Sequence, residues 1–251
     1  MTPDVSRPGG TDGGVETLST GHRVELPLST AARIRGVVLP ASRPAVRSLL
    51  PDGLIPVRAT PTRAAVALLS IAYDRIGRRG EIEPYDEFAV VLPAVPDNTR
   101  PLVSTLTGGV GGYVDFLPVT TEPARALGVD VWDYPKVVAD VTHRTAGSTR
   151  HTTVTVGGQR FVDLSVDAPP MVPTSRSATS YTTFDGDLLS ERLTLDGRIG
   201  AWPASDAFSY TLGEHPRAER LRRLDIGDRA LLRVAADAEV TIHAGRRVGC
   251  A

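Results

Sequence analysis

The chain is a succession of short apolar segments separated by glycine- and proline-rich turns, and this pattern limits what it can fold into. Residues 33–39 and 85–92 are rich in β-branched side chains and partly alternate with polar ones, which is typical of strands. The apolar run 63–73 has a length at which periodicity alone leaves both a helix and a buried strand open. Short strands therefore dominate the expected structure.

Two dipeptides mark places where strands are expected to turn back on themselves. Gly157-Gly158 and Asp196-Gly197 both favour the two-residue turns of β-hairpins. Together with only brief helices, these segments predict a mostly β, antiparallel fold (α+β) without a linker that would divide it. The expected strand pairs are 152–156 with 159–162 and 190–195 with 199–202, and 229–242 is expected to supply two last strand segments.

Three short helices are expected, and in the first two a capping residue, Ser42 or Thr121, comes shortly before a proline. Such a proline suits the first turn, because the first backbone N–H groups of a helix have no partner within the helix. The expected helices are 42–50, 121–127 and 216–224. In the second of them Thr121 is the expected cap, and Gly128 is expected to end the helix.

Four glycines, Gly108, Gly109, Gly111 and Gly112, lie within residues 104–116 and could suggest a phosphate-binding loop. Such a loop would continue with Lys-Ser or Lys-Thr and open a helix, and neither follows here. These glycines are instead expected where a strand bends or packs closely on another backbone.

Composition excludes several classes of function. The formal net charge of -1 predicts no broad attraction to nucleic acid or to an anionic membrane, and no apolar run approaches the ~18 residues of a membrane span. Residues 1–21 lack the apolar stretch of a secretory signal and are predicted to form a disordered arm, followed by a single domain over 22–251. The scattered histidines and the sole cysteine, Cys250, indicate neither a metal site nor a disulfide, so we expect a cytoplasmic protein that needs no metal or cofactor.

Lys136 is the only lysine among 28 Lys and Arg residues, so every other basic side chain is arginine. Arginine stays protonated in proteins, whereas a desolvated lysine can lose its proton and attack a carbonyl carbon to form an imine. Pro135 and the apolar residues after Lys136 predict the start of a half-buried strand, which can point the amine into the protein. Compositional bias that happened to spare one lysine is the alternative explanation.

The residues around Lys136 resemble those of the acetoacetate decarboxylase family. Glu122-Pro123-Ala124 is followed after eleven residues by Lys136, within a Tyr-Pro-Lys motif. Tyr85-Asp86-Glu87 is similar to the family's Tyr-x-Glu. The resemblance extends over most of the chain from about residue 22, and the C-terminal stretch near 238–240 is similar too.

This resemblance implies an antiparallel β-barrel-like fold, an enclosed site and a homo-oligomer. It implies that Lys136 forms the imine, that Glu87 is an acid/base or orienting group, and that an arginine from the first strand region holds the substrate carboxylate. That arginine is expected to be Arg33, with Arg35 as its competitor. Further expected substrate-binding residues are Tyr85, Tyr113, Trp132 and Tyr134.

Three functions remain open at this point. The first is an imine-forming lyase on a small keto acid, with decarboxylation of a 3-oxo acid as the best single choice. The second is aldol, dehydration or cyclisation chemistry on a 2-oxo acid with the same lysine. It is favoured by Val137, because the family's decarboxylases carry a second lysine at that position. The third is a non-catalytic small-molecule binding protein.

Overall fold

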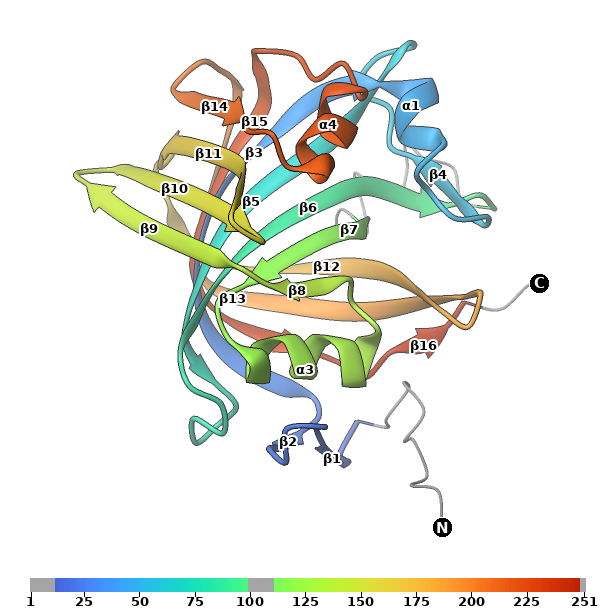
Figure 1. Ribbon diagram of the computed structural model, residues 1–251, viewed down its shortest axis with the longest axis vertical. Coiled ribbons are helices and arrows are strands. Elements are labelled where there is room, and N and C mark those ends of the chain that lie inside the picture. Colours follow the sequence, from blue (N-terminus) through green and yellow to red (C-terminus); the bar gives the residue numbers. More distant parts are fainter. Residues whose placement is uncertain (1–11, 99–110, 249–251) are drawn as a thin grey trace.

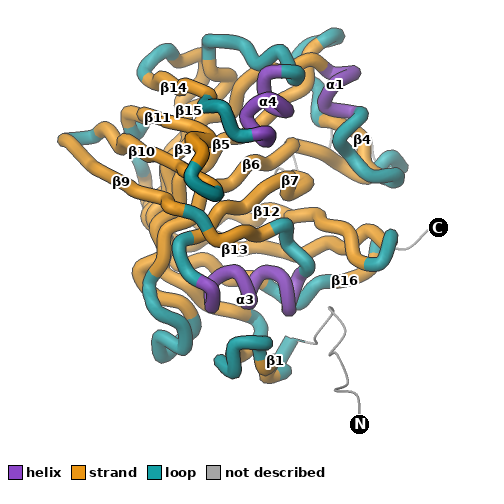
Figure 2. Tube along the Cα trace, viewed as in Figure 1, coloured by secondary structure: helices purple, strands orange, loops and turns teal. Residues whose placement is uncertain are grey.

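The computed structural model describes residues 12–98 and 111–248, and a closed barrel of seven strands dominates it (Figure 1). Neighbouring strands pair in the order β6-β5-β3-β15-β13-β12-β7, and β6 also pairs with β7, which closes the circle. The mostly β, barrel-like prediction is confirmed (Figure 2). The barrel strands are β3 (Leu28–Ser42), β5 (Arg63–Ile76), β6 (Tyr85–Pro96), β7 (Gly111–Val119), β12 (Val172–Phe184), β13 (Asp187–Ser205) and β15 (Ala230–Ile242).

Smaller strands extend the barrel and cover one side of it. β4 pairs with β6, β8 with β7, β16 with β13, and β1 with β2. A second sheet, in the order β14-β11-β10-β9, lies against the barrel. Pairing is antiparallel except that β7 runs parallel to both β8 and β12. The bounds are β1 (Val15–Thr17), β2 (Arg23–Glu25), β4 (Leu54–Pro56), β8 (Lys136–Val138), β9 (Asp140–Ala146), β10 (Thr149–Val156), β11 (Gln159–Asp167), β14 (Phe208–Leu212) and β16 (Arg246–Arg247).

The described residues form three helices, α1 (Arg43–Arg47), α3 (Glu122–Trp132) and α4 (Pro216–Arg222), close to the predicted positions. The Thr121 side chain accepts a hydrogen bond from the backbone N–H of Ala124, as expected of a cap. The predicted end at Gly128 is wrong, because α3 continues to Trp132 and ends at Asp133, which has the left-handed φ of 53°. Among these helices none is long and apolar enough to cross a membrane.

Two hydrophobic cores lie on opposite faces of the barrel wall. The α3-side core joins α3 to residues such as Ile71, Tyr85 and Leu117 of the barrel strands. The small-sheet core joins α1, α4 and the four-stranded sheet to residues such as Leu68 and Phe88. Because successive strand residues point to opposite faces, β5 and β6 must be apolar at nearly every position. This double burial explains the continuous apolar run 63–73, which is strand rather than helix.

Of the two predicted hairpin turns, the structure confirms one and contradicts the other. Gly157 and Gly158 both have positive φ, 56° and 78°, and join β10 to β11 in the predicted hairpin. The turn predicted at Asp196-Gly197 is wrong, because β13 runs unbroken from residue 187 to 205. Gly197 instead allows close strand packing, since a Cβ there would lie 2.4 Å from the carbonyl oxygen of Asp237 on β15. β15 is likewise one strand, where two segments were predicted.

The glycines of β7 have the packing role expected from the sequence. A Cβ on Gly111 would lie 2.9 Å from the Ala94 carbonyl oxygen, and one on Gly112 would lie 2.4 Å from Val91 Cγ1. Gly108 and Gly109 lie outside the described residues. β7 can therefore approach β6 closely, and this pairing closes the barrel.

The N-terminal segment is more ordered than predicted where the structure describes it. Residues 15–17 form β1, Leu18 is buried, and the Asp12 carboxylate accepts hydrogen bonds from Ala244 and pairs with His243. Residues 1–11 of the predicted arm lie outside the described residues. The ordered part of the chain therefore begins before residue 22.

The Gly197→Ala variant should lose about 1–3 kcal/mol in free energy of unfolding, because its methyl group would push β13 away from β15. Urea denaturation of the variant and the parent measures the loss. Gly245→Ala is the control, since its Cβ would meet no atom closer than 3.5 Å. Equal stability of Gly197→Ala and the parent would contradict the close packing.

Candidate active site

Lys136 and Glu87 form a buried ion pair in the α3-side core. The Lys136 Nζ lies 2.7 Å from Glu87 Oε2, and each side chain is only 5% exposed. The same amine donates a hydrogen bond to the hydroxyl of Tyr85 at 3.4 Å. Glu87 and Tyr85 come from β6, while Lys136 begins β8 on the far side of β7. The structure thus brings together the lysine and the glutamate that the sequence predicted.

The end of α3 positions Lys136. The Tyr134 backbone N–H donates to the carbonyl of Gly128, and the Lys136 N–H donates to the carbonyl of Tyr134. Gly128 faces the lysine stem directly, since a Cβ there would lie 2.4 Å from both Cδ and Cε of Lys136. The glycine expected to end the helix therefore has a different role. It gives the lysine side chain room to run along α3.

Three tyrosines enclose the pair. The rings of Tyr73 and Tyr85 lie 4.7 Å apart, and Tyr134 is buried beside them. Burial raises the pKa of Tyr73 and of Tyr85 well above the usual range, and the charge of Glu87 raises both further. Burial, followed by the charge of Glu191, does the same to the pKa of Tyr134. All three hydroxyls therefore stay protonated and can donate hydrogen bonds.

Trp132 forms the wall behind Tyr134. Their ring centroids are 5.8 Å apart, and the indole N–H donates to the carbonyl oxygen of His243. Since this donor is already occupied and the ring is buried, Trp132 supports the site by packing.

A second buried carboxyl, Glu191 on β13, was missed by the sequence reasoning. It accepts a hydrogen bond from Ser180, whose hydroxyl oxygen lies 2.7 Å from the hydroxyl of Tyr134. Burial raises the pKa of Glu191 to about 8, although its hydrogen bonds with Ser180 and Tyr134 act to lower it. The alternation of Leu189, Glu191 and Leu193 was the available signal, because it places Glu191 on an apolar face.

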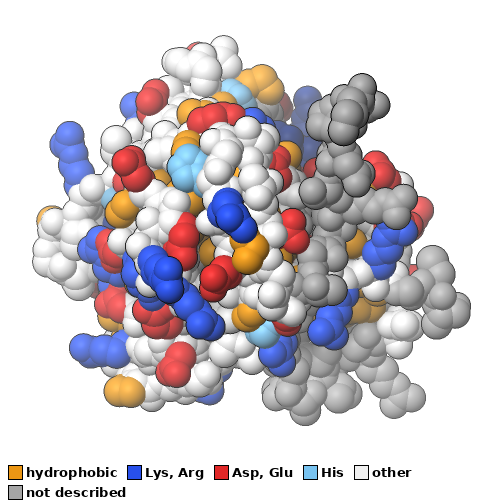
Figure 3. All heavy atoms as spheres, turned by 90° about the horizontal axis from the view of Figure 1, so that it is seen from below, with side chains coloured by type: hydrophobic (Ala, Val, Ile, Leu, Met, Phe, Trp, Pro, Cys, Tyr) orange, Lys and Arg blue, Asp and Glu red, His pale blue; other side chains and the backbone are white. Residues whose placement is uncertain are grey.

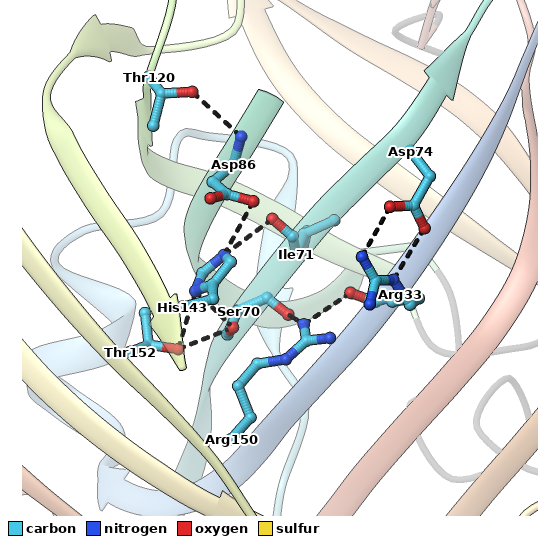
Figure 4. Close-up of polar contacts among 9 residues, drawn as sticks. All are labelled: Arg33, Ser70, Ile71, Asp74, Asp86, Thr120, His143, Arg150 and Thr152. Atoms are coloured by element: carbon cyan, nitrogen blue, oxygen red, sulfur yellow. Dashed lines mark hydrogen bonds and ion pairs between the residues drawn. The ribbon is translucent and has the colours of Figure 1, made fainter. Parts of the chain in front are cut away.

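The structure does not bring Arg33 or Arg35 to Lys136, and this corrects their expected position. On paired strands, directly opposite residues share a face. Ile34 lies opposite Ile71, which lies opposite Glu87, so the residues on either side of Ile34 point to the other face of the wall. On that face Arg33 pairs with Asp74 (Figure 4). Arg35 pairs there with Asp237.

Tyr113 also lies away from the lysine. It is opposite Leu92 on β6 and packs against the small-sheet core, whereas the lysine lies in the α3-side core. A register shift in the β6–β7 pairing, between Val90 and Val91, determines which β7 residues face each core, and periodicity cannot predict such a shift.

Comparison with known protein families adds a match over nearly the whole chain. The model of the family described as acetoacetate decarboxylase matches residues 25–248. The chain belongs to the acetoacetate decarboxylase family. Comparison with curated proteins finds no match.

Several solved structures share the fold of this chain at low sequence identity. The enduracididine biosynthesis enzyme MppR, complexed with pyruvate, is 15% identical with a TM-score of 0.67 over 88% of this chain and 90% of that one. Acetoacetate decarboxylase from Legionella pneumophila is 16% identical with a TM-score of 0.66, over 89% and 87%. An acetoacetate decarboxylase-like enzyme from Sphingomonas wittichii is 14% identical with a TM-score of 0.61, over 88% and 92%.

Lys136 therefore has a carboxylate beside it and hydrogen-bond donors around it. Glu87 can accept a proton from the amine, and the tyrosine hydroxyls can donate to an oxygen of a bound molecule. Among the described residues no group of three or more His, Cys, Asp or Glu could hold a metal ion.

The Lys136→Met variant should lose about 3–5 kcal/mol of stability, because it leaves the Glu87 carboxylate buried without its partner. A Lys136→Met, Glu87→Leu double variant should recover most of this loss, because neither charge then remains. Chemical denaturation of the two single variants and the double variant measures the coupling. As a control, Asp74→Asn removes an ion pair that is about half exposed on both sides and should cost at most about 1 kcal/mol. Additive effects at Lys136 and Glu87 would contradict a tightly coupled pair.

Stability should fall as the pH rises from about 4.3 to about 8, through the buried carboxyl of Glu191. Between these values the folded protein keeps a proton that the unfolded chain releases, so the free energy of unfolding decreases by up to roughly 1.4 kcal/mol per pH unit. Glu191→Gln should remove this contribution. Denaturant titrations at several pH values compare the two slopes, and parallel curves for the two proteins would contradict a neutral, buried Glu191.

Proposed function

We propose that this protein is an imine-forming lyase that acts on a small keto acid through Lys136. The observation that carries the proposal is the buried amine 2.7 Å from a buried carboxylate, in a chain of the acetoacetate decarboxylase family. Desolvation lowers the cost of removing the proton from a lysine ammonium, and a neighbouring carboxylate can accept that proton. Desolvation is one of the two general ways to activate a lysine nucleophile, for which acetoacetate decarboxylase itself is the usual example.

The first steps are common to every reaction of such a site. Glu87 accepts a proton from the Lys136 ammonium, and the free amine adds to the ketone carbon of the substrate. The resulting carbinolamine loses its oxygen as water, for which Glu87 returns the proton, and a protonated imine remains. In this proposal Tyr85 and Tyr134 donate hydrogen bonds to the substrate carboxylate, because the register of β3 places Arg33 and Arg35 on the other face of the wall.

Decarboxylation of a 3-oxo acid is the first candidate reaction. The bond between the carboxylate and C2 breaks, CO2 leaves, and the electron pair moves through C2 into the imine to give an enamine. Glu87, which returned its proton in the dehydration step, takes up a proton from solvent and gives it to C2, and this restores the protonated imine. Water hydrolyses the imine, which releases the ketone and restores the lysine.

Chemistry on a 2-oxo acid is the second candidate, and Val137 favours it. Val137 follows the proposed imine lysine and packs against the small-sheet core. Because valine is uncharged, this position supplies no cation beside the amine. Glu87 would remove a proton from C3 of the imine, and the enamine would attack an aldehyde or expel a β-hydroxyl group. MppR, which has a similar fold, has been solved in complex with pyruvate, and pyruvate is a 2-oxo acid.

Borohydride reduction should trap a covalent adduct on Lys136 in the presence of acetoacetate or pyruvate, measured by intact mass. The single lysine makes assignment direct, and peptide mapping separates it from the terminal amine. An acetone-derived adduct with CO2 release supports the 3-oxo acid reaction, whereas a pyruvate adduct without CO2 supports the second candidate. Lys136→Met is the control that should give no adduct.

Glu87→Gln should still form some adduct but turn over about 10²–10⁴-fold more slowly, because the proton carrier is gone. The absence of an adduct with either keto acid, in a folded parent protein, would favour the binding-protein alternative.

A further inference from the structure

Four arginines line a pocket of about 360 Å³ on the face of the wall opposite the lysine. Arg33 and Arg35 come from β3, Arg150 from β10 and Arg198 from β13. The rest of the lining comes from two regions: the end of β9 with its turn into β10 (Thr145, Gly147 and Ser148), and the connecting segment 168–171 between β11 and β12. The pocket thus lies where the barrel and the small sheet meet.

The positive charge of this pocket is only partly neutralised. Asp74 pairs with Arg33, and Asp237 pairs with Arg35. Within the described part of the chain, Arg150 and Arg198 have no carboxylate within 4 Å. By contrast, basic and acidic side chains are interspersed on the face shown in Figure 3. Two guanidinium groups that lack a described acidic partner therefore face one cavity.

Arg150 is unusual because it is 5% exposed and still has no acidic partner among the described residues. Its Nη1 donates to the backbone carbonyl oxygens of Arg33 and Ser70, which hold the group beneath the pocket (Figure 4). Burial lowers the pKa of Arg150 to about 10, and the neighbouring guanidinium groups of Arg35 and Arg33 add to the lowering, while the more distant carboxylates of Asp237 and Asp86 oppose it. A buried charge held in this way is stabilised by an anion.

The pocket walls are already held in place. The Ala168 N–H donates to the carbonyl of Ser148, which ties the two regions together. Arg198 donates to the carbonyl of Met171, and Gly200 packs so closely on the connecting segment that a Cβ would lie 2.2 Å from the Pro170 oxygen. A ligand therefore binds to a preformed cavity, and few protein groups have to become ordered when it binds.

We propose that this four-arginine pocket binds a small oxyanion, a phosphate or a multiply charged carboxylate, at a site separate from Lys136. Arg150 and Arg198 contact the anion directly, and Arg33 and Arg35 add positive charge to the pocket around it. The guanidinium fork matches both phosphate and carboxylate oxygens, so both ligand types share this recognition. Strand alternation places the site across the wall from Glu87, so occupation does not require the catalytic pair.

Titration calorimetry of the full chain with inorganic phosphate, and separately with malonate, tests the site. Saturable binding is expected, with affinity that falls as the NaCl concentration rises. Arg198→Ala should weaken it about tenfold, as the loss of one charge-assisted hydrogen bond predicts. Arg150→Gln should abolish it, and circular dichroism shows whether that variant folds. Preference between the two probes identifies the ligand source.

Arg229→Ala is the matched control. Arg198 and Arg229 are both exposed, each donates to one backbone carbonyl at 3.3–3.4 Å, and neither has an acidic partner among the described residues. Phosphate affinity should be unchanged in Arg229→Ala and in the Lys136→Met, Glu87→Leu double variant, which removes the proposed lysine chemistry without leaving a buried unpaired charge. The proposal is overturned if neither probe binds saturably, if Arg198→Ala binds as tightly as Arg229→Ala, or if the folded double variant loses the binding.

Discussion

The buried pairing of Lys136 with Glu87 is the interaction on which the rest of the site depends. A single charge removed from water costs several kcal/mol, whereas two opposite charges 2.7 Å apart offset much of that cost for each other. The pair links β6 to β8 across β7, so it depends on the strand order that closes the barrel. In the proposed reaction, a ketone that reaches the amine therefore meets the carboxylate at the same time, and the amine and its proton acceptor act as one unit.

The surrounding structure holds this pair in an apolar setting. α3 runs against the lysine stem at Gly128, and the tyrosines from β5 and β6 close the opposite side. In the same region Glu191 is a second carboxyl, kept neutral at moderate pH by its burial. Of these two buried carboxyl groups, only Glu87 has a cation beside it, at 2.7 Å. This difference is the usual basis for separate acid and base roles.

The sequence predicted the strand content, the Lys136–Glu87 pair and the N-terminal cap of α3, because each depends on local patterns or on a motif. It did not predict that β13 is unbroken, since Asp196-Gly197 favours a hairpin turn until β15 is known to lie against it. Arg33 and Arg35 were expected at the lysine because the resemblance implies an arginine from the first strand region, and a resemblance does not fix the register of that strand. In a strand, a shift of one residue moves a side chain to the other face.

Because the side chains of a strand alternate between its two faces, one wall of strands lines both the lysine site and the arginine pocket. Along β3, Ala32 and Ile34 face the α3-side core while Arg33 and Arg35 face the arginine pocket. Along β5 and β6, Ile71 and Glu87 face the lysine, whereas Ser70 and Asp86 face the His143 and Arg150 network (Figure 4). Substitutions of single wall residues therefore act on one side only if they leave the strand backbone in place. A substitution of glycine by a larger residue displaces the backbone, and it would therefore change both faces of the wall.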